Sequence, residues 1–447
     1  MYMNGSSRDS RLYRLRGALW HNTRWLVPGL GVKRWLGLVL LGTTLTGVGL
    51  AMWLLDFYRT APETWWLPAI SAASLRFLPR ILRVLIFGGL GVGMIAGGIW
   101  GLNRALMAPF LRPGRRVVDE LTVHRRRERG PRMVTIGGGH GLATLLRGLK
   151  EYSNNLTAIV TVADDGGSSG RLRQTMGILP PGDIRNCLAA LSNDEAMLAQ
   201  LFQYRFPNGA SGLDGHSFGN LFISALAEIT GSFEEAVAES GRVLSVSGRV
   251  LPSTLHDVRL VADVILPHMV REVRVIGESQ IPESSGRVRR VWLEPTYPQA
   301  FPQAIQAILA ADMVLIGPGS LYTSILPNLL VPDIAAAVRA SRALKIYICN
   351  LATQPGETDG YTCGDHVRAI DEHAGSNLFE MVVTNSNTEG ELPEDIQLVY
   401  TEEDLETDYP VYRTDLIDPT RPWRHDSAKL ARVLIDLLQE RTGPLIE

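Results

Sequence analysis

The chain has 447 residues, of which 45% are hydrophobic and 20% are charged. This length and composition predict a folded protein with a substantial core, built as two to three domains or as one large domain with an appendage. The formal net charge of −2 excludes a nucleic-acid binder that acts through its bulk charge. The 3 cysteines show no zinc-like spacing, so they exclude a disulfide framework and predict reduced cytosolic thiols.

The N-terminal quarter of the chain departs from a soluble pattern. Residues 1–34 form a basic segment, and uncharged apolar stretches follow at 35–55 and 84–102. A helix needs roughly 20 apolar residues to cross a bilayer, so we expect residues 35–102 to form a two-helix membrane hairpin. Basic residues before this hairpin and in the connector 103–130 favour a cytosolic position for both ends, although the intervening loop also carries arginines. We therefore expect a multi-pass protein of the cell membrane whose main domain is cytoplasmic.

From residue 131 onward, apolar strand patterns alternate with helical ones. Strands are predicted at 133–136, 156–162, 313–316, 345–350 and 380–384, and helices at 142–152, 301–311 and 427–441. Helical patterns dominate 184–244, whereas 258–294 is rich in Val, Ile and Arg with turn signals and predicts inserted β-hairpins. This alternation predicts one α/β domain over 131–447, with a doubly wound, mostly parallel sheet and helices on both faces.

The first candidate ligand loop lies between the first strand and the first helix of this domain. Glycine lets the backbone approach a ligand closely, and the next helix offers unpaired N–H groups that suit a phosphate. The loop is neither a complete GxGxxG nor a P-loop, and a tight turn without a ligand is the alternative. Its residues are Gly137, Gly138, Gly139, His140 and Gly141.

The second candidate loop follows the second strand. Its adjacent carboxylates, Asp164 and Asp165, can hold Mg²⁺, orient a ribose or act as a base. Arg171 can pair with a phosphate. A solvated loop without function is the alternative. The hydroxyl and backbone donors of this loop are Gly166, Gly167, Ser168 and Ser169.

Two further polar segments are weaker candidates. In Pro180–Asn186 we expect Asp183 to be a helix N-cap, and Asn186 is a candidate contact, although the segment by itself is more often structural. In the second segment, His216 and Asn220 stand at or near a helix start, where an amide can contact a base or a phosphate-bearing group.

The last candidate loop repeats the strand, glycine turn and helix order. Gly317, Gly319 and Ser320 form a second anion cradle by the argument used for the first loop. Two such loops on one sheet predict a ligand with two or more phosphates, bound by backbone amides that face one cleft. A GxSxG nucleophile elbow, an HExxH zinc motif and the kinase signatures are absent from the sequence.

Together these strings resemble the gluconeogenesis-factor family (YvcK-like), a branch of the CofD-like superfamily, over about residues 131–445. The strings Asp164–Gly170 and His216–Asn220 are the specific part of the resemblance. It implies a Rossmann-like fold and a nucleotide-sugar ligand, with UDP-N-acetylglucosamine as the best candidate. It also implies a regulatory role in growth on gluconeogenic carbon sources, cell-wall synthesis and cell shape.

The resemblance leaves other functions open. The related transferase branch moves a phospholactyl group from a nucleotide carrier with Mg²⁺, and by position Asp164 and Asp165 would hold that metal here. A non-catalytic binding protein is our first expectation and a transferase the second. A membrane scaffold that recruits wall-synthesis proteins is the third, and we further expect the chain to form a homo-oligomer.

Overall fold

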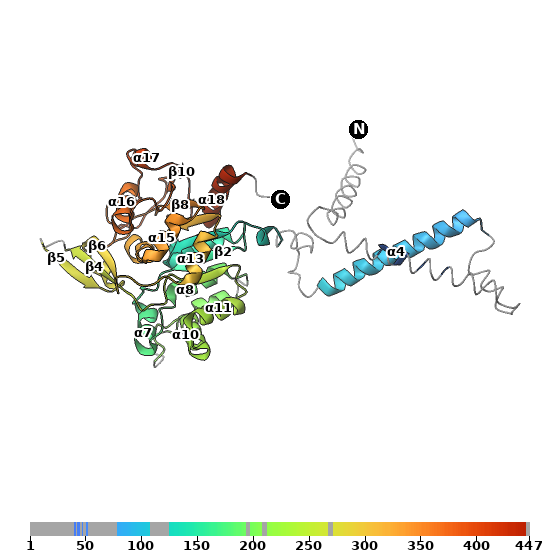
Figure 1. Ribbon diagram of the computed structural model, residues 1–447, viewed down its shortest axis with the longest axis horizontal. Helices are drawn as coiled ribbons and strands as arrows, with labels where there is room; N and C mark the ends of the chain where they lie inside the picture. The colour runs from blue at the N-terminus through green and yellow to red at the C-terminus, as the bar shows by residue number, and fades with distance from the viewer. Residues whose placement is uncertain are drawn as a thin grey trace, which may run out of the picture. The chain divides into compact units, whose positions relative to one another are not determined.

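The computed structural model describes residues 78–107, 125–193, 197–207, 212–266 and 271–443, together with isolated positions between 40 and 51. The chain divides into two compact units, Met1–Arg125 and Arg126–Glu447 (Figure 1). Each unit is described by itself below.

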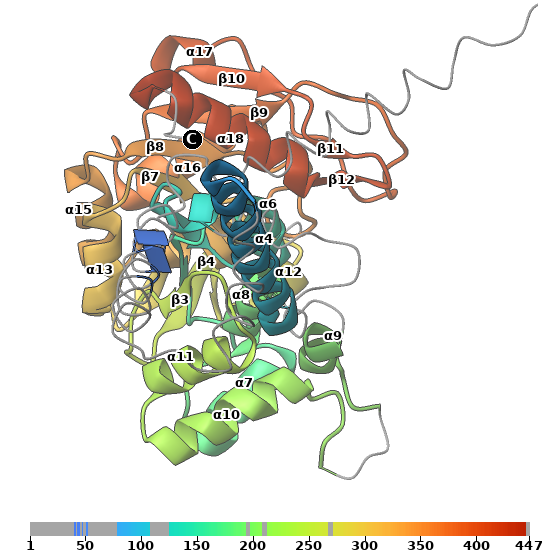
Figure 2. The ribbon, with the colours of Figure 1, turned by 90° about the vertical axis from the view of Figure 1, so that its right-hand side faces the viewer.

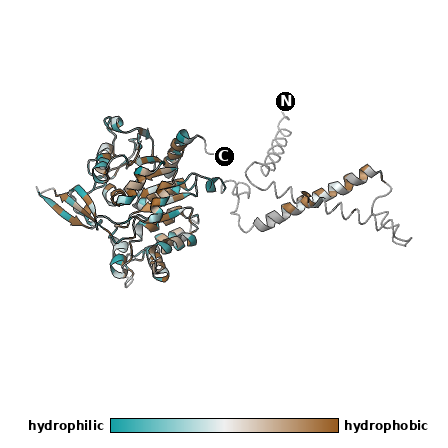
Figure 3. Ribbon diagram, viewed as in Figure 1, coloured by the Kyte–Doolittle hydropathy of each residue, from teal (hydrophilic) through white to brown (hydrophobic). Residues whose placement is uncertain are grey.

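The first unit contains one long described helix, α4, which covers Arg80–Met107. It includes the second predicted membrane segment, and its ribbon carries hydrophobic stretches (Figure 3). Large apolar side chains such as Leu85 and Trp100 are exposed on it. Within the described part of the chain, no single helix passes a combined test of length and apolarity for crossing a membrane. The first predicted span lies almost entirely outside the described residues, as do residues 1–34 and most of the connector.

The second unit is built on a seven-stranded sheet with the order β10-β9-β8-β7-β1-β2-β3. Every neighbouring pair in it is parallel. Side chains of the central strands are buried on both faces, which explains their uninterrupted apolar sequences. The strands are β1 (Met133–Gly137), β2 (Leu156–Val160), β3 (Arg249–Pro252), β7 (Met313–Ile316), β8 (Leu344–Ile348), β9 (Met381–Asn385) and β10 (Val411–Thr414).

This strand order confirms the predicted doubly wound α/β core. From β1 at the centre of the sheet, the chain runs outward to β2 and β3. It then crosses to β7 on the other side of β1 and continues outward to β10. The direction of winding therefore reverses between β1 and β7. Ligands of open parallel sheets bind in the crevice that such a reversal leaves at the carboxyl ends of the strands.

Helices cover both faces of the sheet. Figures 1 and 2 show α7, α10 and α11 at one end of the domain and α17 and α18 at the opposite end. The amphipathic helix α6 packs against α8 and α18. The helices are α6 (Gly139–Leu149), α7 (Gly167–Met176), α8 (Gly182–Leu191), α9 (Met197–Gln203), α10 (Phe218–Thr230), α11 (Phe233–Val243), α13 (Pro302–Leu309), the π-helix η3 (Leu321–Ile325), α14 (Leu326–Leu329), α15 (Pro332–Ala340), α16 (Cys363–Ala374), α17 (Leu405–Asp408) and α18 (Ser427–Thr442).

Two local expectations are corrected. The polar cluster after β2 is not a loop throughout, because α7 begins within it at Gly167. Asp183 is not an N-cap, because Pro181 holds that position and Asp183 lies in the first turn of α8. There its carboxylate is free to accept the backbone N–H of Gly139 instead.

The predicted hairpin insertion is confirmed as a separate antiparallel sheet with the order β5-β4-β6. It consists of β4 (Arg259–Ile265), β5 (Glu272–Ile276) and β6 (Arg287–Glu294), with the short helix α12 (Gln280–Glu283), and lies at one edge of the domain (Figure 1). The short hairpin of β11 (Ile417–Asp418) and β12 (Arg421–His425) was not expected from the sequence.

Candidate functional site

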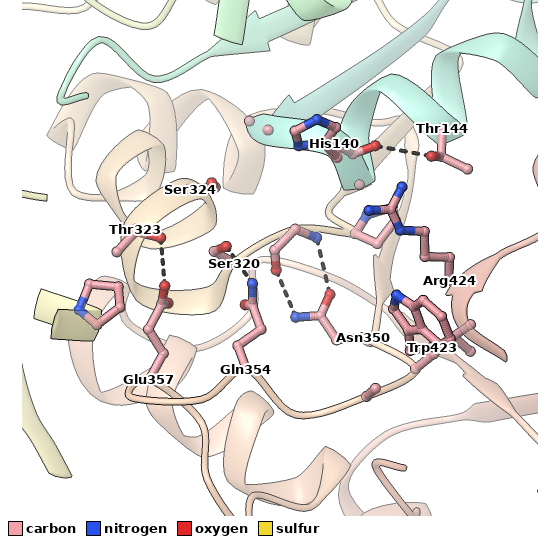
Figure 4. Close-up of a pocket in the computed structure, with 18 of the residues that line it drawn as sticks. His140, Thr144, Ser320, Thr323, Ser324, Asn350, Gln354, Glu357, Trp423 and Arg424 are labelled. Atoms are coloured by element: carbon pink, nitrogen blue, oxygen red, sulfur yellow. Dashed lines mark hydrogen bonds between the residues drawn. The ribbon is translucent and has the colours of Figure 1, made fainter. Parts of the chain in front are cut away.

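A cavity of about 610 Å³ lies at the carboxyl ends of β1, β7 and β8, at the reversal of the strand order (Figure 4). Its volume is in the range of small-molecule sites. Residues from both predicted glycine loops line it, and so do residues from the three-stranded insertion and from β12. Its polar and glycine lining includes Gly138, Gly139, His140, Gly141, Thr144, Thr161, Asp164, Asp183, Glu278, Gly319, Ser320, Thr323, Ser324, Asn350, Thr353, Gln354, Glu357, Trp423, Arg424 and His425.

The first glycine loop needs glycine for two distinct reasons. Gly139 has φ +66°, a left-handed conformation that other residues adopt only with strain. A Cβ on Gly141 would lie 2.7 Å from the carbonyl oxygen of Pro318, so a side chain there would push the two glycine loops apart. The N-cap residue Gly138 has no side chain to cap α6, and Asp183 accepts the N–H of Gly139, so the other N–H groups of the first turn are the ones that an anion can use.

The second glycine loop is held in place by an amide side chain. The N–H of Gly319 donates to Oδ1 of Asn350 over 3.1 Å, and Nδ2 of Asn350 donates back to the carbonyl of Gly319 over 2.8 Å (Figure 4). Nε2 of Gln354 donates to Oγ of Ser320 over 2.7 Å. A π-helical turn follows and places Thr323 and Ser324 on the same cavity. Such turns occur frequently at functional sites.

Carboxyl groups gather on one side of the cavity. Burial raises the pKa of Glu278 to about 9, with further contributions from the negative charges of Asp164 and Asp183. Burial also raises the pKa of Asp183 to about 7 and that of Glu357 to about 7. The pKa of Asp164 is raised as well, again mainly by burial. Clustered carboxyl groups of this kind hold protons unless a cation joins them.

The residues present fit a magnesium ion that is shared with a phosphate ligand. Mg²⁺ commonly takes one or two carboxylates and completes its shell with phosphate oxygens and water. Oε2 of Glu357 is buried without a hydrogen-bond partner, although Oε1 accepts the hydroxyl of Thr323 over 2.9 Å. Among the described residues no three acidic, His or Cys side chains are arranged to hold a metal ion by themselves. A protein-only metal site is therefore not preformed there.

The other side of the cavity is aromatic and basic. Trp423 and Arg424 reach it from β12, and the buried His425 hydrogen-bonds to the backbone of Cys349 at the end of β8. Burial lowers the pKa of His425 to about 4, so this histidine is neutral. The pKa of His140 is also lowered, first by burial and then by the charge of Arg424.

The structure brings some predicted site residues to the cavity and leaves others behind it. Gly137 ends β1 and Gly317 directly follows β7, and neither lines the cavity. Asp165 accepts the N–H of Ser279 over 3.0 Å, which fixes the insertion beside Glu278. Gly166 and Gly167 start α7 outside the lining. Arg171 donates to the carbonyl of Asp214.

The serine, histidine and asparagine of the specific motifs form a buried network instead. Oγ of Ser168 lies 3.0 Å from Nδ1 of His216 and accepts Nδ2 of Asn220 over 3.1 Å. Ser169 also accepts from Asn220. This network joins the starts of α7 and α10 directly behind Asp164. Asn186 lies on α8 outside the main cavity and accepts from Arg185 over 2.8 Å.

Several lining residues escaped the sequence analysis. Asn350 and Gln354 follow β8, so the rule that ligands bind at the carboxyl ends of strands could have identified them. Glu357 follows in the same loop. Glu278, Trp423 and Arg424 carried no local signal, because an insertion and a late hairpin deliver them.

Comparisons with known proteins agree with this fold. The model of the CofD family, 2-phospho-L-lactate transferase, matches residues 133–439, so the domain is a CofD-like one. A putative gluconeogenesis factor of Nostoc sp. is 51% identical over 374 residues, which cover 82% of this chain and 79% of that protein. The gluconeogenesis factor of Bacillus subtilis is 46% identical over 331 residues, 69% of this chain and 99% of that protein.

A solved structure gives the same result. A protein of the UPF0052 family from Bacillus halodurans superposes with a TM-score of 0.64 at 41% identity, covering 68% of this chain and 99% of that one. This chain belongs to the gluconeogenesis-factor family of the CofD-like superfamily.

Proposed function

We propose that the domain binds a nucleotide-sugar of the UDP-N-acetylglucosamine type and acts as a regulator rather than as a catalyst. One observation carries the proposal: the two glycine loops meet in one cavity, where Gly141 faces the carbonyl of Pro318. The start of α6 and the hydroxyl of Ser320 thereby reach one anionic ligand, while the N–H of Gly319 is donated to Asn350. A diphosphate has two phosphate groups and can therefore contact both loops at once.

The arrangement of the cavity supports this assignment of its parts. The diphosphate lies against the start of α6 and against Gly319 and Ser320. Trp423 and Arg424 line the cavity, where an indole suits stacking with a base and a guanidinium suits a charge-assisted bond to a phosphate. Asp164 would hold a magnesium ion, which would neutralise the charge of the phosphate groups.

The cellular role is proposed from the family. Relatives are named gluconeogenesis factors, and we propose that ligand occupancy reports nucleotide-sugar supply to cell-wall synthesis and cell shape during gluconeogenic growth. Such a reporter acts through protein partners of wall synthesis, and self-association of the chain is part of this proposal.

Calorimetric titration of the purified chain with UDP-N-acetylglucosamine and Mg²⁺ tests the binding. We expect a saturable heat and a rise in melting temperature, because a ligand that binds only the folded state stabilises it. If millimolar ligand gives neither a heat of binding nor a shift in melting temperature, the proposal that the domain binds a nucleotide-sugar is wrong.

A transferase is the second candidate, and the carboxyl cluster is the observation that favours it. Carboxyl groups with raised pKa values beside a phosphate site can serve metal-assisted or acid–base chemistry. The test is Mg²⁺-dependent consumption of a phospholactyl nucleotide in the presence of a deazaflavin acceptor. Consumption of the donor would move the assignment to catalysis.

We also propose that the first unit anchors the chain to a membrane through the apolar segments 35–55 and 84–102. The exposed apolar side chains of α4, among them Leu90 at 61% exposure, support this proposal. Cell fractionation tests it: the full chain should sediment with membranes and resist high-salt extraction. Release by salt alone would contradict an apolar anchor.

A further inference from the structure

A second cavity, of about 690 Å³, lies between the three-stranded insertion and the helices α14, α15 and α16. It is separate from the ligand cavity, because the two have no lining residue in common. Strands β4, β5 and β6 supply one wall and the helices supply the other. Several of the lining side chains are exposed, so the cavity is a groove in the surface of the domain. We call it the insertion groove.

A histidine joins the two walls of the insertion groove. The N–H of Val291 on β6 donates to Nε2 of His373 over 3.1 Å, and Nδ1 of the same ring donates to the carbonyl of Ala369 over 2.7 Å. The first contact requires a neutral ring. Burial lowers the pKa of His373, and the charge of Arg290 adds to this effect while that of Glu372 opposes it. The groove is therefore already formed in the single chain.

Aromatic side chains line the insertion groove at positions that solvent reaches. Tyr297, directly after β6, is 82% exposed. Trp292 is half-buried, and the guanidinium of Arg274 lies 4.8 Å from the centroid of its ring. Leu330 and Pro332 add apolar surface from the opposite wall. Tyr, Trp and Arg are the residues that most often dominate the affinity of protein interfaces, so this composition suits a protein partner.

The charges that line the insertion groove are balanced in sign. Of the three acids and three arginines, Asp263 pairs with Arg274 over 3.4 Å, and Arg339 donates to the carbonyl of Ser376. The other four are exposed and form no ion pair with a described residue. These four are Glu272, Glu372, Arg289 and Arg290. A partner of a single charge sign would leave half of them unpaired, whereas the same surface turned by a two-fold axis offers each sign its opposite.

We propose that the insertion groove docks against the same groove of a second copy of this chain, which gives a two-fold symmetric dimer. Across the axis, the two arginines of one copy face the two unpaired acids of the other. Tyr297 of each copy packs into the apolar part of the opposite groove. The inference gives a location to the self-association named in the proposed function, and it holds whether or not a nucleotide-sugar is bound.

Reversal of charge tests this interface without fixing the individual pairs. Arg289→Glu with Arg290→Glu makes the groove acidic, and Glu272→Arg with Glu372→Arg makes it basic. Sedimentation of the full chain in detergent should show a dimer for the wild type and a monomer for each double variant, because like charges then meet across the axis. An equimolar mixture of the two double variants should form a dimer again, because every reversed charge meets its opposite.

Arg242→Glu with Arg432→Glu is the matched control. It makes the same change of charge at exposed positions of α11 and α18, outside the insertion groove, and should leave the dimer intact. Tyr297→Ala should raise the dissociation constant of the dimer about tenfold or more, as expected for an aromatic anchor of an interface. A melting curve on each variant shows that it is folded.

The outcomes separate this inference from the ligand function. A wild-type chain that stays monomeric at every concentration would overturn the inference. A dimer that survives both double variants would do so too, because its interface would lie elsewhere. Monomeric variants that fail to associate when mixed would overturn the two-fold arrangement. UDP-N-acetylglucosamine should bind the monomeric variants as it binds the wild type, and absence of binding by a wild-type dimer would overturn the proposed function alone.

Discussion

Glycines two residues apart in the first loop are required for different physical reasons. Gly139 is needed for its left-handed backbone, whereas Gly141 is needed because the Pro318 carbonyl occupies the space of a side chain. The carboxyl group of Asp183 lies directly beside this loop and accepts the N–H of Gly139, and burial and neighbouring carboxylates keep it and Glu278 partly protonated. At this scale the site is a backbone cradle for an anion next to acids that require a proton or a cation.

Gly139→Ala separates backbone strain from loss of ligand contact. Gly177 has the same φ of +66° but open space around it, so Gly177→Ala is a matched control. Both variants should lose about 1–2 kcal/mol of stability from left-handed strain. Only Gly139→Ala should also weaken binding of UDP-N-acetylglucosamine, measured by calorimetry. Equal affinity in the two variants would contradict a ligand role for this loop.

Glu278→Gln tests the carboxyl cluster through pH. The folded-state pKa of about 9 lies above the ordinary value of 4.5, so folding binds a proton there. The stability from this group is complete below about 4.5 and is lost as the pH rises through about 9. The melting temperature should therefore fall less steeply with increasing pH for Glu278→Gln than for the wild type.

The exposed Glu283 on α12 provides the control for that experiment. Glu283→Gln should leave the pH dependence of the melting temperature as it is. If Glu278→Gln and Glu283→Gln behave alike, the cluster does not hold a shifted proton.

At the scale of elements, the site is assembled by contacts between segments that end at one edge of the sheet. The loop after β8 holds the loop after β7 through Asn350, and Asp165 holds the insertion through Ser279. The Ser168, His216 and Asn220 network fixes α7 to α10 behind Asp164. Side chains that the sequence suggested as contacts thus position the segments that carry the lining.

Asn350→Ala should release the second glycine loop. It removes two hydrogen bonds and leaves the backbone of Gly319 unpaired, so a loss of about 1–3 kcal/mol in stability is expected. Affinity for the nucleotide-sugar should fall together with stability. Asn387→Ala is the control: Asn387 follows β9 at the same edge but does not line the cavity. A variant at 350 with unchanged affinity would show that this loop is not part of the binding site.

At the scale of the molecule, the ligand domain is one doubly wound core whose crevice takes lining from the insertion and from the C-terminal hairpin. The crevice has carboxyl groups on one side and Trp423 and Arg424 on the other. A diphosphate spans both, so the acidic side needs a counter-ion when the ligand is bound.

Removal of divalent metal tests this requirement. Titration of UDP-N-acetylglucosamine in EDTA should show roughly tenfold weaker binding, or ~1.4 kcal/mol, than in millimolar Mg²⁺. Lowering the pH through about 7 should recover part of the loss, because Asp183 and Glu357 then take up protons. Affinity that is the same with and without Mg²⁺ would remove the metal from the proposal.

The sequence by itself determined the α/β core, the position of most of its strands, the hairpin insertion and the two glycine loops. Those features depend on short-range patterns: apolar runs for buried strands, glycines at strand ends and alternating residues in hairpins. Only the tertiary structure decided which polar residues line the cavity. Glu278, Glu357 and Arg424 come from distant segments, while Ser168 and His216 turn inward to each other. The direction of each side chain and the packing between distant segments determine which residues line the cavity. Neither can be predicted from a local sequence pattern.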